Sequence, residues 1–166
     1  DFEAHMIQHQ MGAFTDCNHG MGLAAIHPAY YRRICRDGLA KFAAFAERVW
    51  EIPAQGKTQE ELALAGIDAL EAFIRSIGLP ATLRELGITD RSLLKPIADS
   101  CLINEGGYQA LTHGEILEIL EAPAESKAQK RMDSREILDI LEAASLEELQ
   151  PAAGQKPEEQ PASQKR

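Results

Sequence analysis

Apolar residues recur three and four positions apart along most of this chain, and no stretch of convincing length alternates apolar with polar residues. The first pattern is that of helices with one buried face, whereas the second would indicate half-buried strands. The spacing therefore predicts an all-α protein, folded as a helical bundle. It is clearest at residues 39–49 and in the helix expected after Thr58, which carries Leu62, Ala65, Leu70, Phe73, Ile74 and Ile77.

The first part of the chain is expected to form three helices. Residues 3–11 are predicted to be helical, with Gly12 ending the helix and residues 13–18 forming a loop. His19 and Gly20 then begin a second helix. Pro28 suits the first turn of a further helix, because proline lacks the N–H that would be unsatisfied there anyway.

Capping residues mark helix starts further along the chain. Pro96 lies inside a later apolar pattern and is expected to kink or split that helix. The candidate N-caps are Thr58 and Thr112, each followed by a glutamate at the spacing of a capping box, together with Thr82 and Thr89.

Composition excludes several classes of protein. The chain has 166 residues, 45% of them hydrophobic, and a formal net charge of −9 at pH 7. This length supports one domain with its own core, and the negative charge argues against nucleic-acid binding. Cys17, Cys35 and Cys101 are widely spaced, which disfavours a disulfide framework and indicates a reducing, cytoplasmic location. No apolar run reaches the roughly 18 residues of a membrane span.

Three of the five histidines, His5, His9 and His19, lie close together in the sequence. On a helix, His5 and His9 lie one turn apart and project into one space. Two or three imidazoles with an open position are typical of a catalytic metal site. Alternatively, they are polar residues of a partly buried helix, bonded to backbone carbonyls or water. His27 and His113 lie outside this spacing; we expect His27 to support the site or pack, and His113 to be exposed.

The histidines belong to the run His-x3-His-x9-His-Gly, followed by an apolar segment at residues 23–26 and Pro-Ala-Tyr-Tyr at 28–31. This run resembles the metal-binding signature of the iron-containing alcohol dehydrogenases, and is most similar to their butanol dehydrogenase-like branch. Residues 46–50, 73–86 and 104–108 add to the likeness. It covers about residues 1–121 and implies the C-terminal helical domain of a two-domain dehydrogenase.

The resemblance gives each clustered histidine a role. It implies that His5 and His19 are the third and fourth ligands of an Fe²⁺ ion, for which Zn²⁺ is a substitute. It places His9 beside the nicotinamide and the substrate, as a catalytic and cofactor-binding residue that is not a ligand. The first two ligands, an aspartate and a histidine, would precede this signature, as would the nucleotide-binding domain. Asn18 departs from the pattern, because many relatives have a proline or a small residue there.

The implied enzyme is a metal-dependent alcohol dehydrogenase that interconverts primary alcohols and aldehydes by hydride transfer with NAD or NADP. Its partner would be a small alcohol or aldehyde, with neither nucleic acid nor membrane involved, and the full-length enzyme would be a homodimer. Since the chain starts at Asp1 and lacks two of the implied ligands, we expect a fragment that is inactive alone.

The end of the chain differs in character. Residues 1–122 are expected to form the metal-binding helical domain. The sequence Glu-Ile-Leu-Glu-Ile-Leu-Glu-Ala at 115–122 is repeated almost letter for letter at 136–143, so residues 123–150 are predicted to be a linker and a duplicated amphipathic helix. Residues 151–166 are polar and expected to be disordered. The repeat suggests an alternative function, a helical protein-interaction module derived from such an enzyme.

Overall fold

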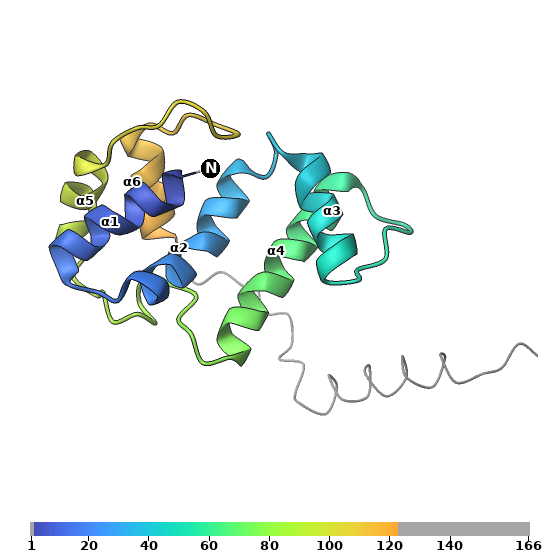
Figure 1. The fold of residues 1–166 in the computed structure, drawn as a ribbon, viewed down its shortest axis with the longest axis horizontal. Coiled ribbons are helices and arrows are strands. Elements are labelled where there is room, and N and C mark those ends of the chain that lie inside the picture. Colours follow the sequence, from blue (N-terminus) through green and yellow to red (C-terminus); the bar gives the residue numbers. More distant parts are fainter. Residues whose placement is uncertain (1, 123–166) are drawn as a thin grey trace, which may run out of the picture. The chain divides into compact units, whose positions relative to one another are not determined.

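The computed structural model describes residues 2–122, which lie in one compact unit, Asp1–Ser126. These residues form helices and loops with no strand among them (Figure 1), so the predicted all-α fold is confirmed for this part. No helix within residues 2–122 combines the length and apolar character needed to cross a membrane. The predicted linker, duplicated helix and tail lie outside the described residues. The helices are α1 (Glu3–Thr15), α2 (His19–Ile34), α3 (Leu39–Val49), α4 (Gln59–Ser76), the 3-10 helix η1 (Arg91–Leu93), α5 (Leu94–Ser100) and α6 (His113–Glu121).

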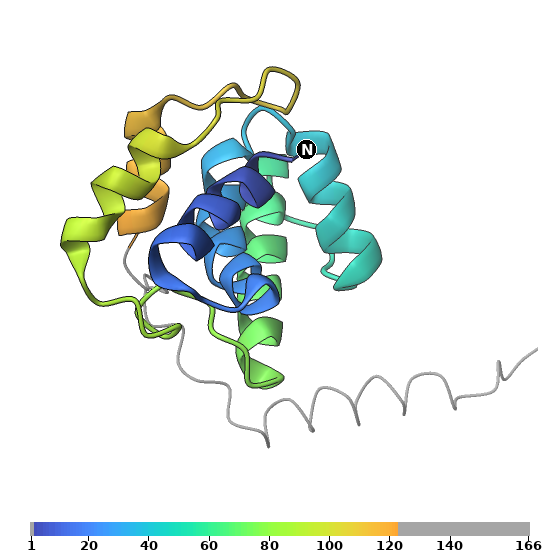
Figure 2. The ribbon, with the colours of Figure 1, turned by 60° about the vertical axis from the view of Figure 1, so that its left-hand side comes forward.

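Helix α2 lies in the middle of the described part and contacts α1, α4 and α6. Figure 1 shows α1, α5 and α6 to one side of it and α3 and α4 to the other, and in Figure 2 α5 and α6 again lie on the opposite side from α3. Its residues Ile26, Tyr30 and Ile34 recur four apart and are all buried. Fully burying one aliphatic side chain contributes roughly 1.5–3 kcal/mol, so this shared core holds the helices together. The same core includes Ile7, Met11, Ile67, Ile97, Leu111 and Ile116.

Two helix boundaries differ from the prediction. Helix α1 passes through Gly12 and ends at Thr15, where Asp16 adopts a left-handed conformation with φ 53°. Helix α2 likewise continues through Pro28, which is buried inside it. A helical glycine costs about 1 kcal/mol and a proline about 3 kcal/mol relative to alanine. Burial of apolar residues on both sides of each position outweighs that local cost.

The two predicted capping boxes are confirmed. The hydroxyl oxygens of Thr58 and Thr112 each accept a hydrogen bond from the backbone N–H three residues later. Glu61 and Glu115 in turn accept from the N–H groups of these threonines, at 2.8 and 2.7 Å. Each box satisfies two N–H groups that a helix start leaves without partners.

The segment between α4 and α5 was predicted less well. Thr82 accepts a hydrogen bond from the Glu85 N–H at 3.2 Å, but in a turn and not in a helix. Asp90, and not Thr89, caps η1. The apolar pattern around Pro96 is divided between Leu93 and Leu94, into η1 and α5, and not at Pro96, where the split was predicted. Pro96 lies in the first turn of α5, where its missing N–H leaves no bond unmade.

Candidate metal centre

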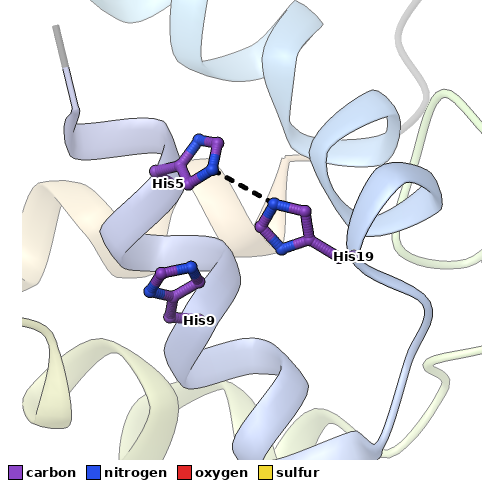
Figure 3. A group of neighbouring side chains, drawn as sticks. All are labelled: His5, His9 and His19. Atoms are coloured by element: carbon purple, nitrogen blue, oxygen red, sulfur yellow. Dashed lines mark hydrogen bonds between the residues drawn. The ribbon is translucent and has the colours of Figure 1, made fainter.

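Three histidine side chains from two consecutive helices converge on one space. His5 and His9 lie one turn apart on α1, and His19 is the first residue of α2. Figure 3 shows His5 and His19 pointing toward each other across the gap between the two helices, with His9 one turn along α1. One ring nitrogen from each lies within 4.8 Å of the others. The structure thus brings together the three residues that the spacing singled out.

His5 and His19 form the closest pair of rings. Their Nε2 atoms are 3.1 Å apart and their ring centroids 4.7 Å apart, whereas the His9 centroid is 5.4 Å from each. Two imidazole nitrogens bound to one ion at about 2.0–2.1 Å, at right or tetrahedral angles, lie about 2.8–3.4 Å apart. The observed separation fits that requirement. It also fits a hydrogen bond between the two rings, in which one Nε2 donates and the other accepts.

The close approach of α1 and α2 depends on Gly22. A Cβ atom at this position would lie 2.8 Å from Met11 Cε and 3.0 Å from Gln8 Cγ, closer than side chains pack. Met11 and Gln8 are both buried on α1. The glycine therefore allows α2 to lie against these side chains, and this contact sets the distance between the helices that carry the histidines.

The connection between the helices also fixes His19. Only residues 16–18 join α1 to α2. The Asn18 side-chain oxygen accepts a hydrogen bond from the Met21 N–H at 3.1 Å. Asn18 is thus the N-cap of α2 and directly precedes its first residue, His19. Asparagine is among the most favourable N-cap residues. Although Asn18 departs from the family pattern, it therefore still caps the helix whose first residue is His19.

The cluster is open on one side. His5 is half-buried, and His9 and His19 are exposed. An ion held by the His5 and His19 nitrogens would keep positions free for further ligands, as catalytic sites require. Within residues 2–122, this is the one cluster in which three or more His, Cys, Asp or Glu side chains converge. The donor set therefore fits a transition-metal ion such as iron or zinc, for which imidazole is a suitable ligand.

The sequence analysis missed one buried polar residue on the helix that carries His5 and His9. Glu3, at the start of α1, is 3% exposed, and its Oε2 accepts a hydrogen bond from the Asn104 N–H at 3.1 Å. This bond ties the loop after α5 to the helix that carries His5. A carboxylate in a first helical turn is ordinarily solvated, so no local signal in the sequence indicated that this one is buried.

The two remaining histidines do not join the cluster. His27 is half-buried, its Nδ1 lies 2.6 Å from the Leu23 carbonyl oxygen, and burial lowers its pKa. It packs edge-on against Tyr31, in line with the packing role among the two expected. His113 is exposed, as predicted, but its Nε2 lies 3.0 Å from the Cys101 carbonyl oxygen. Burial raises the pKa of the Cys101 thiol to about 11, which disfavours its thiolate form.

Residues 2–124 match the model of the Fe-containing alcohol dehydrogenase family, C-terminal. The match covers well over half of the chain. The chain belongs to this family, and the predicted resemblance is confirmed.

Similarity to individual proteins supports the same family assignment. The chain is 37% identical to the probable NADH-dependent butanol dehydrogenase 1 of Bacillus subtilis, over 74% of this chain and 32% of the relative. It is 30% identical to the NADPH-dependent aldehyde reductase of Escherichia coli, again over 74% of this chain and 32% of the relative. The crystal structure of NADH-dependent butanol dehydrogenase A from Thermotoga maritima is 28% identical, with a TM-score of 0.65, over 73% of this chain and 32% of that one. The chain thus spans about a third of the length of these relatives.

Proposed function

We propose that this chain supplies the histidine part of the metal site in a metal-dependent, NAD(P)-linked alcohol dehydrogenase that interconverts primary alcohols and aldehydes. The observation that carries the proposal is the 3.1 Å approach of the His5 and His19 Nε2 atoms in a domain of this family. Relatives named as butanol dehydrogenases and as an aldehyde reductase support the substrate class.

In this proposal His5 and His19 hold the ion, Fe²⁺ or its substitute Zn²⁺, through their Nε2 atoms. Helices α1 and α2 hold both rings in place before any ion arrives, so little conformational entropy is lost on binding. A bound ion supplies Lewis acidity and the nicotinamide supplies the redox chemistry.

His9 has a different role. Its ring is exposed and stands 5.4 Å, centroid to centroid, from each ring of the closer pair. We assign it to the substrate and the nicotinamide, where an imidazole positions the reactants or relays a proton. This separation between a ligand pair and a third, more distant ring matches the roles that the family resemblance implies.

The proposal makes residues 1–166 a part of an enzyme. They carry two of the four ligands that the resemblance implies, and they span 32% of the Bacillus subtilis relative. We therefore expect weak metal binding and no turnover from these residues alone. The complete enzyme would be a cytoplasmic homodimer that acts on a small alcohol or aldehyde.

The test is to fuse residues 1–166 to the portion of the Bacillus subtilis relative that precedes its matched region, and to measure iron and zinc per chain by mass spectrometry. We expect about one ion per chain, and nearly none in His5→Ala or His19→Ala, because an open site tolerates no loss of ligands. His9→Ala should keep the ion but lower NADH-dependent aldehyde reduction by at least about 100-fold.

His113→Ala is the matched control, since this histidine lies outside the cluster and should retain both metal and activity. Equal metal content in His19→Ala and the unsubstituted fusion would overturn the proposal. It would then favour the protein-interaction module, for which these histidines are immaterial. Turnover by residues 1–166 alone would contradict the expectation that they are only part of the enzyme.

A further inference from the structure

A cavity of about 340 Å³ lies between α1, α2, α3 and the loop that joins α5 to α6. Its walls are mainly aromatic: Tyr31 comes from α2, Phe42 and Phe45 come from α3, and Tyr108 comes from the loop. The three clustered histidines are not among the residues that line it. Sites for small molecules typically have volumes of about 300–1,000 Å³ and apolar or aromatic linings. The cavity is therefore large enough for a small ligand.

The aromatic walls consist of rings that pack on one another. Phe42 stands between Tyr31 and Tyr108, with ring centroids 5.3 and 6.0 Å away. The Tyr108 ring lies directly against Gly38, the N-cap of α3, where a Cβ atom would be 2.9 Å from the ring. Figure 1 shows the loop after α5 reaching toward this start of α3. Aromatic rings favour contact with a further ring at such distances, so these walls suit an aromatic ligand.

The charge of the lining favours an anion. The lining contains no carboxylate, although acidic residues outnumber basic ones by 26 to 17 in the chain. Its one cationic side chain is Lys41, because burial lowers the pKa of His27 and favours its neutral form. The arginines of α2, Arg32, Arg33 and Arg36, are all paired with carboxylates. Lys41 forms no ion pair within residues 2–122 and is exposed at the cavity, so its charge is available to a ligand.

The Tyr31 hydroxyl adds a hydrogen-bond donor. Tyr31 is half-buried, and burial raises its pKa, so the hydroxyl keeps its proton. In the part of the chain that the structure describes, this hydroxyl has no hydrogen-bond partner. Hydrogen bonds to an ionised acceptor are roughly twice as strong as those between neutral groups. A lysine and a tyrosine hydroxyl on an aromatic wall therefore favour a carboxylate attached to an aromatic ring.

We propose that this cavity is a second ligand site, separate from the histidine cluster, and that it binds a small aromatic carboxylate. The ring of the ligand lies among Tyr31, Phe42 and Tyr108, and its carboxylate meets Lys41. An aliphatic carboxylate would lose the ring contacts, and a neutral aromatic compound would lose the ion pair. The site shares no residue with the proposed metal centre, so it does not depend on the proposed function.

Isothermal titration calorimetry of residues 1–166 with 2-naphthoate tests the charge, with EDTA present and salt at about 50 mM to limit screening. We expect a dissociation constant on the order of 0.1–1 mM, and about 10-fold weaker binding of the uncharged 2-naphthamide. Lys41→Gln should bind both compounds with the lower affinity. Lys57→Gln is the matched control, because it removes the same charge from an exposed residue outside the cavity. Equal affinity for both compounds in the unsubstituted chain, or an unchanged preference in Lys41→Gln, would overturn the proposal.

The same titration tests the aromatic wall. Tyr108 is 43% exposed, so Tyr108→Ala should leave the midpoint of thermal unfolding unchanged while it weakens 2-naphthoate binding about 3–10-fold. Tyr108→Phe should retain the full affinity, since it keeps the ring. His5→Ala should also retain it, because the cluster is not part of the site. Unchanged binding by Tyr108→Ala would overturn the proposal. So would a loss of binding in His5→Ala, which would place the carboxylate at the histidines.

Discussion

The helix pairs α1–α2 and α3–α4 are each brought together at a glycine, but the two glycines meet different neighbours. A Cβ atom at Gly66 of α4 would lie 2.8 Å from the Cβ, 3.0 Å from the Cα and 3.2 Å from the backbone nitrogen of Ala46. A Cβ atom at Gly22 of α2 would instead meet side-chain atoms only, Met11 Cε at 2.8 Å and Gln8 Cγ at 3.0 Å.

This difference separates a rigid contact from an adjustable one. A helix backbone cannot move aside without shifting the whole helix, whereas methionine is flexible and fills gaps of irregular shape. In the α3–α4 pair, which carries no histidine cluster, main-chain atoms therefore fix the distance between the helices. The pair that carries His5, His9 and His19 has side chains between its helices, and these can adjust without moving either main chain.

The largest expected effect is that of Gly66→Ala. The added methyl group must push α3 away from α4, so the free energy of unfolding of residues 1–166 should fall by about 3 kcal/mol, at the upper end of overpacking costs. Urea unfolding followed by circular dichroism measures this. Gly114→Ala is the control: its nearest neighbour is Thr112 Oγ1 at 3.8 Å. It should stabilise the protein by about 0.5–1 kcal/mol.

Gly22→Ala should have a smaller effect on stability, about 1 kcal/mol, because Met11 and Gln8 can rotate away. It should nevertheless weaken zinc binding by the fusion described above about 10-fold, since the spacing of His5 and His19 changes. The matched control is Gly20→Ala, in the same turn of α2, whose nearest neighbour is Asn18 Oδ1 at 3.6 Å. A Gly22→Ala variant as destabilised as Gly66→Ala would show that both contacts are equally rigid.

The smallest effect is expected at the capping box of α4. The Thr58 N–H and hydroxyl donate to Glu61 and lower its pKa below the ordinary 4.5. The cap thus contributes stability that is fully present above pH 4.5 and is lost as the pH falls through the lowered pKa. The difference in stability between the unsubstituted chain and Glu61→Gln should therefore shrink between pH 7 and pH 3 in thermal unfolding. It should be the same with and without zinc, because the cap belongs to the α3–α4 pair. A pH-independent difference would contradict this.

The sequence predicted those parts of the fold that depend on neighbouring residues. Helix α3 has the predicted bounds, and the boxes at Thr58 and Thr112 form, because side-chain caps act within one turn. The prediction failed at Gly12 and Pro28. There the outcome depends on burial against other helices, which local propensity does not contain.

In the candidate site too, the features that depend on local spacing were predicted and those that depend on contacts between helices were not. Helical spacing was sufficient to place His5 and His9 on one face of α1. The approach of His19 to His5 depends on a contact between two helices, in which Gly22 of α2 packs against Gln8 and Met11 of α1. Neither that contact nor the burial of Glu3 leaves a periodic pattern in the sequence.

The short connection at residues 16–18 has a consequence for assembly. Because the two helices that it joins are consecutive, the His5 and His19 rings become neighbours as soon as this hairpin closes, an event that requires only short-range contacts. Under the proposed function, ligands from the preceding part of the enzyme would therefore meet two imidazoles that are already side by side.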